Sequence, residues 1–170
     1  MPRFGSIRSL TALFVAVGAS SGCLYGFAGG GLPGNIRTVA ILPFDNQTAE
    51  PALTQEVSES VTEAMQRRLG LRPSAEATAD AVVTGTITRY EPDMLLSQRA
   101  GPGGEVAVTR RRVQITLSVQ IYDQREDRVL WQRTGISVDG EYEPPRESEG
   151  RRVALEKLVA DIVDGAQSQW

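Results

Sequence analysis

The chain has 170 residues and a formal net charge of −3, and 41% of its residues are hydrophobic, which is enough for the core of one domain. It contains no histidine and a single cysteine, Cys23. These absences exclude Ser-His-Asp and Cys-His catalytic sites, zinc sites built from cysteine and histidine, and a disulfide within the monomer. The mildly acidic balance also gives no indication of nucleic-acid binding.

The first 22 residues have the composition of an export signal. Arg3 and Arg8 supply positive charge, residues 10–17 are apolar, and residues 18–22 are small. The apolar run is too short for a membrane-spanning helix, which needs about 20 residues. Cys23 follows directly and resembles the cleavage site of a bacterial lipoprotein signal, although Ser20 stands where that pattern has leucine. We therefore expect cleavage before Cys23 and lipid on its side chain. The alternatives are an ordinary signal peptide with an incidental cysteine and a buried apolar N-terminal segment.

Lipidation of Cys23 predicts a membrane-anchored domain that needs no other cofactor. Stable anchoring takes more than one acyl chain, and the lipoprotein resemblance implies that Cys23 carries more than one. Leu24 follows the cysteine where retained proteobacterial lipoproteins have aspartate, which implies delivery to the outer membrane. Residues 23–35 are glycine-rich and predict a flexible tether. Residues 36–170 are expected to form a single domain on the periplasmic side.

The first part of this domain predicts a strand followed by a helix. Residues 36–42 are apolar and β-branched, which favours a buried strand. Residues 45–48 form a polar turn cluster, in which Asp45 and Asn46 are expected to serve as turn and helix-cap residues. Apolar residues then recur at steps of three and four over residues 53–69, which predicts an amphipathic helix.

The middle of the domain predicts two more strands. Residues 81–90 favour a strand that Glu91-Pro92 is expected to end. Residues 106–123 form the longest strand candidate, and apolar and polar side chains alternate along residues 113–121. This period of two places one face on a core and the other toward solvent or a partner.

The last part predicts a return strand at residues 129–138 and a closing helix at residues 148–167. The element order is then β-α-β-β-β-α. Two amphipathic helices and a sheet with one polar face predict an α+β two-layer sandwich, in which a small mixed four-stranded sheet is packed by two helices.

Four blocks in the first third of the mature chain resemble a known family. They are Cys23-Leu-Tyr-Gly-Phe, Gly29-Gly-Gly-Leu-Pro33, Thr38-Val-Ala-Ile-Leu-Pro-Phe44 and Asn46-Gln-Thr-Ala-Glu-Pro51. Together they resemble the LptE-like lipoproteins, which help assemble lipopolysaccharide in the outer membrane. The resemblance implies a non-enzymatic protein that plugs an LptD-type β-barrel, helps it assemble and contacts lipopolysaccharide. The partners it implies are therefore that barrel, the glycolipid and the membrane that holds the anchor.

An arginine cluster is the candidate site for the anionic groups of such a glycolipid. Arg110, Arg111 and Arg112 open the long strand, and Arg89 and Arg99 could extend the patch. Arginine binds phosphate through a bidentate fork. Arg110 and Arg112 should share the polar face of the strand, and Arg111 should point toward the core side. The alternative is a solvated strand end balanced by the acidic surface.

Two other functions stay open at this point. The stretch Thr38-Val-Ala-Ile-Leu-Pro-Phe-Asp-Asn also resembles the opening strand of envelope adaptor lipoproteins of the peptidoglycan-synthase-activator and curli-secretion types. A periplasmic glycoside hydrolase would need two carboxylates across a cleft. Glu56, Glu59 and Glu63 are instead expected to form the solvated face of the first helix.

Three further positions are expected to serve packing. Gly85 lies within a strand, where glycine indicates a bulge or the close approach of another group. Trp131 and Trp170 are expected to be core and docking residues, with an aromatic anchor in a barrel interface as the alternative.

Overall fold

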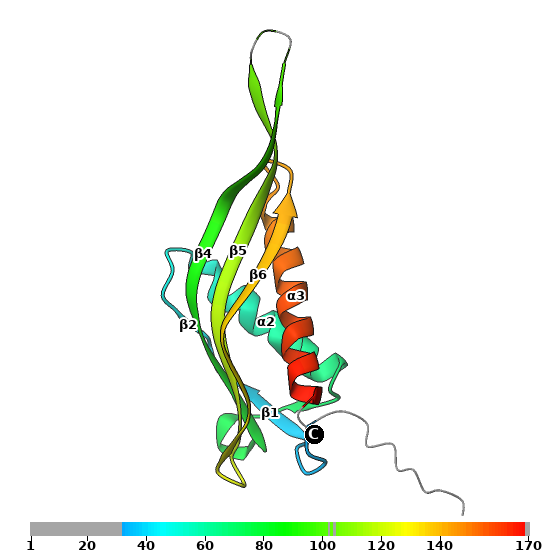
Figure 1. The fold of residues 1–170 in the computed structure, drawn as a ribbon. Helices are drawn as coiled ribbons and strands as arrows, with labels where there is room; N and C mark the ends of the chain where they lie inside the picture. The colour runs from blue at the N-terminus through cyan, green and yellow to red at the C-terminus, as the bar shows by residue number, and fades with distance from the viewer. Residues whose placement is uncertain (1–31, 102, 104, 169–170) are drawn as a thin grey trace, which may run out of the picture.

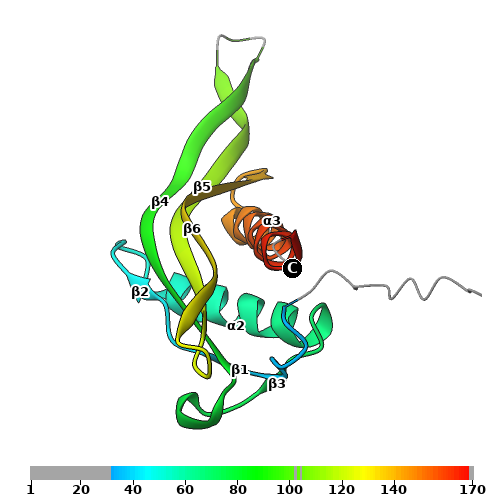
Figure 2. The same cartoon turned by 60° about the horizontal axis from the view of Figure 1, so that its bottom comes forward.

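The computed structural model describes residues 32–101, 103 and 105–168, so the signal segment, Cys23, most of the tether and Trp170 lie outside the described residues. Two helices cover one face of a long, twisted sheet, and most of the opposite face is left open (Figures 1 and 2). The predicted α+β class, with a mixed sheet and a helical layer, is confirmed.

The sheet is mixed and has the strand order β3-β1-β4-β5-β6, with β2 beside β4. β1 pairs in parallel with β3 and β4, β2 pairs in parallel with β4, and β4, β5 and β6 form an antiparallel meander. The strands are β1 (Thr38–Ile41), β2 (Asp45–Asn46), β3 (Arg72–Pro73), β4 (Ala81–Ala100), β5 (Val106–Asp123) and β6 (Arg128–Tyr142). The helices are α2 (Ala52–Arg67) and α3 (Glu147–Ser168), and η1 (Glu76–Thr78) is a short 3-10 turn.

The core fills the space between the sheet and the two helices. Odd-numbered residues of β5 from Val113 to Ile121 are buried, and the even-numbered residues between them are half-buried on the other face. The helices contribute the side chains of Leu53, Val57, Val61 and Met65 from α2 and Leu158 and Ile162 from α3. Each such burial stabilises the fold by about 1.5–3 kcal/mol, so the alternating strand and the helical stripes specify the layered packing.

The sheet contains two strands more than the sequence predicts. β2 and β3 are two residues long, and each exists only through parallel pairing with β4 or β1. Asn46 lies in β2 and also forms the expected turn, because its Oδ1 accepts the backbone N–H of Thr48 at 2.9 Å. The expected helix cap is wrong: α2 begins after Pro51 without a side-chain cap hydrogen bond.

β4 corrects the expectation that Glu91-Pro92 ends the second strand. The strand continues to Ala100, and β6 likewise continues past residue 138 to Tyr142. A register shift separates the paired positions Glu91 and Met94, so Pro92 lies in a bulge. Proline is tolerated there because a bulged residue need not donate to the ladder.

Three glycines permit unusually close contacts. A Cβ atom on Gly85 would lie 2.2 Å from Cε1 of Phe44, so this glycine serves packing, as predicted. A Cβ on Gly140 of β6 would lie 1.9 Å from the carbonyl oxygen of Gly150 in α3. Gly165 of α3 leaves room for the indole of Trp131, which is buried as expected.

Asp80, just before β4, stabilises the end of the sheet where β1 and β4 begin. Its Oδ2 accepts the backbone N–H groups of Arg37 and Thr38, both at 2.9 Å, and its Oδ1 pairs with Arg125 at 2.5 Å. These interactions, of which the hydrogen bond from the Arg37 N–H is the largest, hold the pKa of Asp80 below its ordinary value. Burial of the carboxylate acts in the opposite direction but is outweighed. The carboxylate therefore connects β1, β4 and the β5–β6 turn.

Candidate functional site

Arg110 and Arg112 lie together on the open face of the sheet, as the alternation along β5 predicts. The adjacent strand β6 presents two carboxylates to them. Arg110 pairs with Glu141 at 3.3 Å, and Arg112 lies 3.5 Å from Glu141 and 3.7 Å from Asp139. Lys157 of α3 also binds Asp139, at 3.1 Å, so the cluster joins three positive charges to two negative charges, and an incoming anion has to compete with Glu141 and Asp139.

Arg111 points to the other face of the strand, also as predicted. Its Nη1 donates to the carboxylate of Asp93, which lies beside the bulge of β4. The hydroxyl of Tyr142 lies 2.9 Å from the carbonyl oxygen of Pro92 and 3.0 Å from Oδ1 of Asp93. The hydrogen bond from Arg111, followed by that from Tyr142, holds the pKa of Asp93 below its ordinary value. Arg111 is therefore a structural residue at the end of the core.

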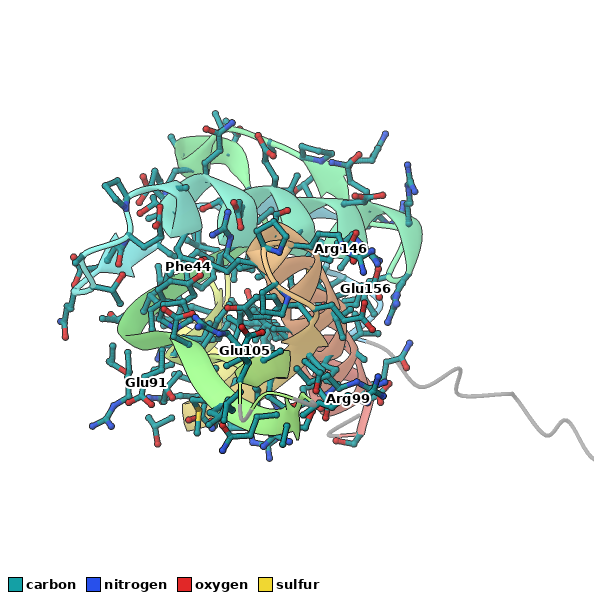
Figure 3. All side chains as sticks on the ribbon, turned by 90° about the horizontal axis from the view of Figure 1, so that it is seen from above. Phe44, Glu91, Arg99, Glu105, Arg146 and Glu156 are labelled. Carbon is teal, nitrogen blue, oxygen red and sulfur yellow. The ribbon has the colours of Figure 1, made fainter. Side chains whose placement is uncertain are left out.

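Arg89 and Arg99 are not gathered into the same cluster. Arg89 lies opposite Thr116 and pairs with Glu91 at 3.2 Å. Thr116 is four residues from Arg112 along β5, which is roughly 13 Å. Arg99 is exposed near the far end of β4, and no ion pair is found for it among the described residues (Figure 3). The predicted arginine patch is thus one compact pair with three separate neighbours.

The open sheet face between these arginines and the start of β4 carries mostly uncharged hydrogen-bonding groups, beside the exposed ion pair of Arg89 and Glu91. Thr84 lies opposite Gln120, and Thr86 lies opposite Ser118. Gln114 and Thr116 continue the row along β5. A shallow pocket of about 660 Å³ lies at its far end, lined by Leu42, Glu76, Ala77, Val82, Thr84, Gln120, Tyr122 and Gln124. This face offers donors and acceptors to a polar partner, and the one ion pair among them, Arg89 with Glu91, has no net charge.

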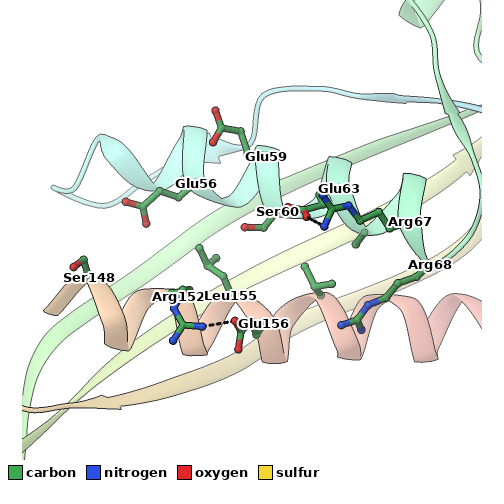
Figure 4. A pocket seen from close by; sticks show the side chains of 12 residues that line it. Glu56, Glu59, Ser60, Glu63, Arg67, Arg68, Ser148, Arg152, Leu155 and Glu156 are labelled. Carbon is green, nitrogen blue, oxygen red and sulfur yellow. Dashed lines mark hydrogen bonds and ion pairs between the residues drawn. The ribbon is translucent and has the colours of Figure 1, made fainter. Parts of the chain in front are cut away.

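A second pocket, of about 590 Å³, lies between α2 and α3 (Figure 4). Its apolar floor includes Leu155 and Val159. Two of the four carboxylates around it pair along their own helix, Glu63 with Arg67 and Glu156 with Arg152. The other two accept hydrogen bonds, Glu59 from Gln55 and Glu56 from Arg151. Interactions within the protein therefore already engage the carboxylates that border this pocket.

Glu56 differs from the solvated helix face that the sequence predicts. It accepts a hydrogen bond from Arg151 of α3 at 3.1 Å, while Glu59 and Glu63 are exposed as expected. Arg151 also donates to Glu147 at 2.7 Å, and the hydroxyl of Tyr90 donates to Glu147. Burial, the largest cause, raises the pKa of Tyr90. This partly buried network joins β4 to both helices, and no local sequence signal could have revealed it because its members are up to 95 residues apart.

Neither a metal centre nor a spanning helix is found in the part of the chain that the structure describes. No group of three or more carboxylates or thiols among residues 32–101, 103 and 105–168 is arranged to hold a metal ion. None of the helices within those residues combines the length and apolar character needed to cross a membrane.

Comparison with known proteins identifies the family. The family model described as "LptE: Lipopolysaccharide-assembly" matches residues 36–168. The chain belongs to the LptE family of lipopolysaccharide-assembly lipoproteins. The sequence resemblance is therefore confirmed over nearly the whole mature domain. No curated protein matches the chain.

Solved structures share the LptE-like fold of this chain. The PelC dodecamer from Paraburkholderia phytofirmans matches with a TM-score of 0.52 and 15% identity, over 81% of this chain and 94% of that chain. Protein XCC0632 from Xanthomonas campestris matches with a TM-score of 0.52 and 13% identity, over 82% of this chain and 90% of that chain. At these identities the likeness concerns the fold alone.

Proposed function

We propose that this protein is anchored through lipid on Cys23 in the outer membrane, faces the periplasm, and acts without catalysis as the plug and assembly factor of an LptD-type β-barrel. Membership of the LptE family supports a role in lipopolysaccharide assembly. The barrel partner and the anchor go beyond that membership and rest on the resemblance and on the surface of the fold.

The observation that carries the plug proposal is the one-sided covering of the sheet. Both helices pack on one face, and the other presents a row of uncharged threonine, serine and glutamine side chains along β5, beside the ion pair of Arg89 and Glu91. The interior of a membrane barrel is polar. A neutral face rich in donors and acceptors fits such a surface, because its groups can exchange water for hydrogen bonds with the barrel wall.

Photo-crosslinking in native outer membranes tests the plug. The crosslinker is placed at Thr116 or Gln120 on the open face, and at the exposed Glu59 or Glu156 on the helical layer as matched controls. The expected result is a crosslink to a large barrel from the open face and none, or far fewer, from the helices. If neither face crosslinked to a barrel, the plug proposal would be wrong. If only the helices crosslinked, the helical layer and not the open sheet face would contact the barrel.

The anchor is tested separately. A Cys23→Ser variant removes the only thiol of the chain and with it the site for lipid attachment. We expect the variant to be recovered in the soluble periplasmic fraction, while the unaltered protein stays with outer membranes. Membrane recovery equal to that of the unaltered protein would contradict lipid anchoring at Cys23.

The arginines remain the proposed glycolipid contacts. Arg110 and Arg112 share one face and can each present a guanidinium fork to a phosphate. Arg111 points to the other face of β5, where Asp93 binds it, and Arg89 and Arg99 are separate from the pair. We therefore place the strongest anion contact at Arg110 and Arg112, in competition with Glu141.

A further inference from the structure

The β4–β5 hairpin continues as a two-stranded arm beyond the rest of the sheet. β6 ends where Tyr142 pairs with Arg111, but β4 and β5 stay paired as far as Ala100 and Val106. We define the arm as the paired residues 93–100 of β4 and 106–110 of β5. It projects past both helices at the top of the molecule (Figure 1). Figure 3 looks down on this end, with Arg99 and Glu105 labelled.

The arm carries most of the exposed apolar side chains of the described residues. Five large apolar side chains are exposed among the described residues. Four of them lie on the arm: Met94 at 37%, Leu95 at 53%, Leu96 at 37% and Val106 at 61%. The fifth, Val129, lies at the opposite end of the sheet in β6. Scattered exposed apolar residues are ordinary, but a cluster on one projecting element indicates a binding surface.

The backbone of the arm is also unpaired along its edges. Among the described residues, β4 has no strand neighbour other than β5 beyond Ile87. From Asp93 to Ala100 the edge carries only two charged side chains, Asp93 and Arg99, and the first of these is bound to Arg111. An open edge of low charge is a template for another strand, and an isolated two-stranded ribbon is only marginally stable in water.

The base of the arm is held in place. Tyr142 contacts both Pro92 and Asp93, and Arg111 binds the same carboxylate. Further out, the hydroxyls of Ser97 and Thr109 lie 2.7 Å apart across the two strands. The direction of the arm is therefore set by the core, which lowers the entropic cost of binding a partner.

Two observations favour a protein strand over a lipid bilayer as the occupant. Insertion into hydrocarbon would leave the open-edge N–H and C=O groups without partners, whereas a partner strand satisfies them. The arm also lies at the far end of β4 from β1, where the described chain begins, and 20 residues of strand span roughly 60 Å. A protein anchored at Cys23 thus holds the arm away from its own anchor.

From these observations we propose that the arm docks by strand addition. The edge of β4 at residues 94–100 pairs with a strand edge that the barrel partner exposes outside its closed wall, where all strands are already paired, and Met94, Leu95 and Leu96 fill apolar depressions beside it. The identity of the partner rests on the proposed function above. The pairing mode goes beyond that function, because a plug could bind through its open sheet face alone.

The experiment uses the full-length protein purified with its barrel from native outer membranes. The variant Met94→Ser/Leu95→Ser/Leu96→Ser is compared with Val129→Ser, an exposed apolar residue outside the arm. Barrel recovery should fall roughly tenfold or more in the triple variant, since one buried leucine side chain alone contributes about that factor. Val129→Ser should retain the barrel, and both variants should melt like the unaltered protein because all the changed residues are exposed.

Backbone hydrogen exchange separates strand pairing from side-chain contact. Amides in residues 94–100 should exchange at least about tenfold more slowly in the complex than in the free protein. Unchanged exchange in an intact complex would overturn strand addition, as would equal protection by outer-membrane lipid vesicles alone. Full barrel recovery by the triple variant would overturn the arm as a docking element while leaving the plug proposal intact; failure of the unaltered protein to recover any barrel would remove both.

Discussion

Replacing Gly140 with alanine is the most demanding test of how α3 packs on the sheet. The added Cβ would lie 1.9 Å from the carbonyl oxygen of Gly150 and 2.9 Å from the backbone nitrogen of Ala154. Both atoms belong to the backbone of α3, so no side-chain rotation can relieve the contact. The first turns of α3 must therefore move away from β6 by about 1 Å or more before the methyl group fits.

The expected cost is near the upper end of the range for overpacking, about 3 kcal/mol. For a domain of this size that corresponds to a fall in Tm of roughly 6–12 °C. The free energy of unfolding can be measured by urea denaturation followed through tryptophan fluorescence. Trp131 is a suitable probe because its indole packs against Gly165 of the same helix.

Two other glycine variants serve as controls. Gly103→Ala should leave stability within about 0.5 kcal/mol of the unaltered protein, because nothing lies within 4 Å of the added Cβ. Gly150→Ala meets the ring of Tyr142 at 2.9 Å, a methyl of Val113 at 3.1 Å and the carbonyl oxygen of Gly140 at 3.1 Å, so its one backbone contact is much less close than the 1.9 Å contact at Gly140. Its cost should be smaller and partly offset by up to about 1 kcal/mol of helix propensity. A Gly140→Ala protein as stable as Gly103→Ala would refute the close approach of β6 and α3.

Three further predictions concern charged groups. Asp80→Asn should destabilise the fold by about 1–3 kcal/mol at neutral pH. Because the pKa of Asp80 is lowered in the folded protein, its contribution to stability is present above the ordinary carboxyl pKa and is lost as pH falls through the folded value. The unfolding curves of the variant and the unaltered protein should therefore converge in acid. Arg151→Met should lower the free energy of unfolding by about 1–2 kcal/mol in the same assay. Arg152→Met is the control and should cost less than about 0.5 kcal/mol, because its partner Glu156 is exposed. Equal losses of stability in the two variants would contradict a special role for the Arg151 network. Glu141→Gln removes the carboxylate shared by two arginines and should strengthen binding of lipopolysaccharide in a salt-dependent titration; unchanged or weaker binding would argue against those arginines as anion contacts.

The sequence predicted much of the architecture where its patterns were long and regular. β5 occupies residues 106–123 as expected, because alternation from Val113 to Ile121 fits only a half-buried strand. The closing helix at Glu147–Ser168 agrees with the predicted residues 148–167. Gly70, which follows the first helix, has a φ of +67°, a conformation that glycine adopts readily. These elements depend on local periodicity and could be read without knowledge of their neighbours.

The predictions were incomplete where a distant strand decided the outcome. Pro92 was expected to end β4, but pairing of Met94 and Leu95 with the arginines of β5 continues the strand through a bulge. The two-residue strands β2 and β3 likewise have no periodicity of their own. The same holds for the candidate site: alternation placed Arg110 and Arg112 on one face, but only the β5–β6 register revealed that Glu141 binds both.

The amino-acid sequence by itself therefore determined the compartment signals, the α+β class, the family and the faces of β5. Composition, periodicity and motif are local properties, and each of these conclusions depends on them alone. The tertiary structure decided which charges neutralise one another, which glycines permit close contact, and that the β4–β5 hairpin extends as an exposed arm. Those outcomes depend on register and on side chains brought together from distant positions, which no local pattern encodes.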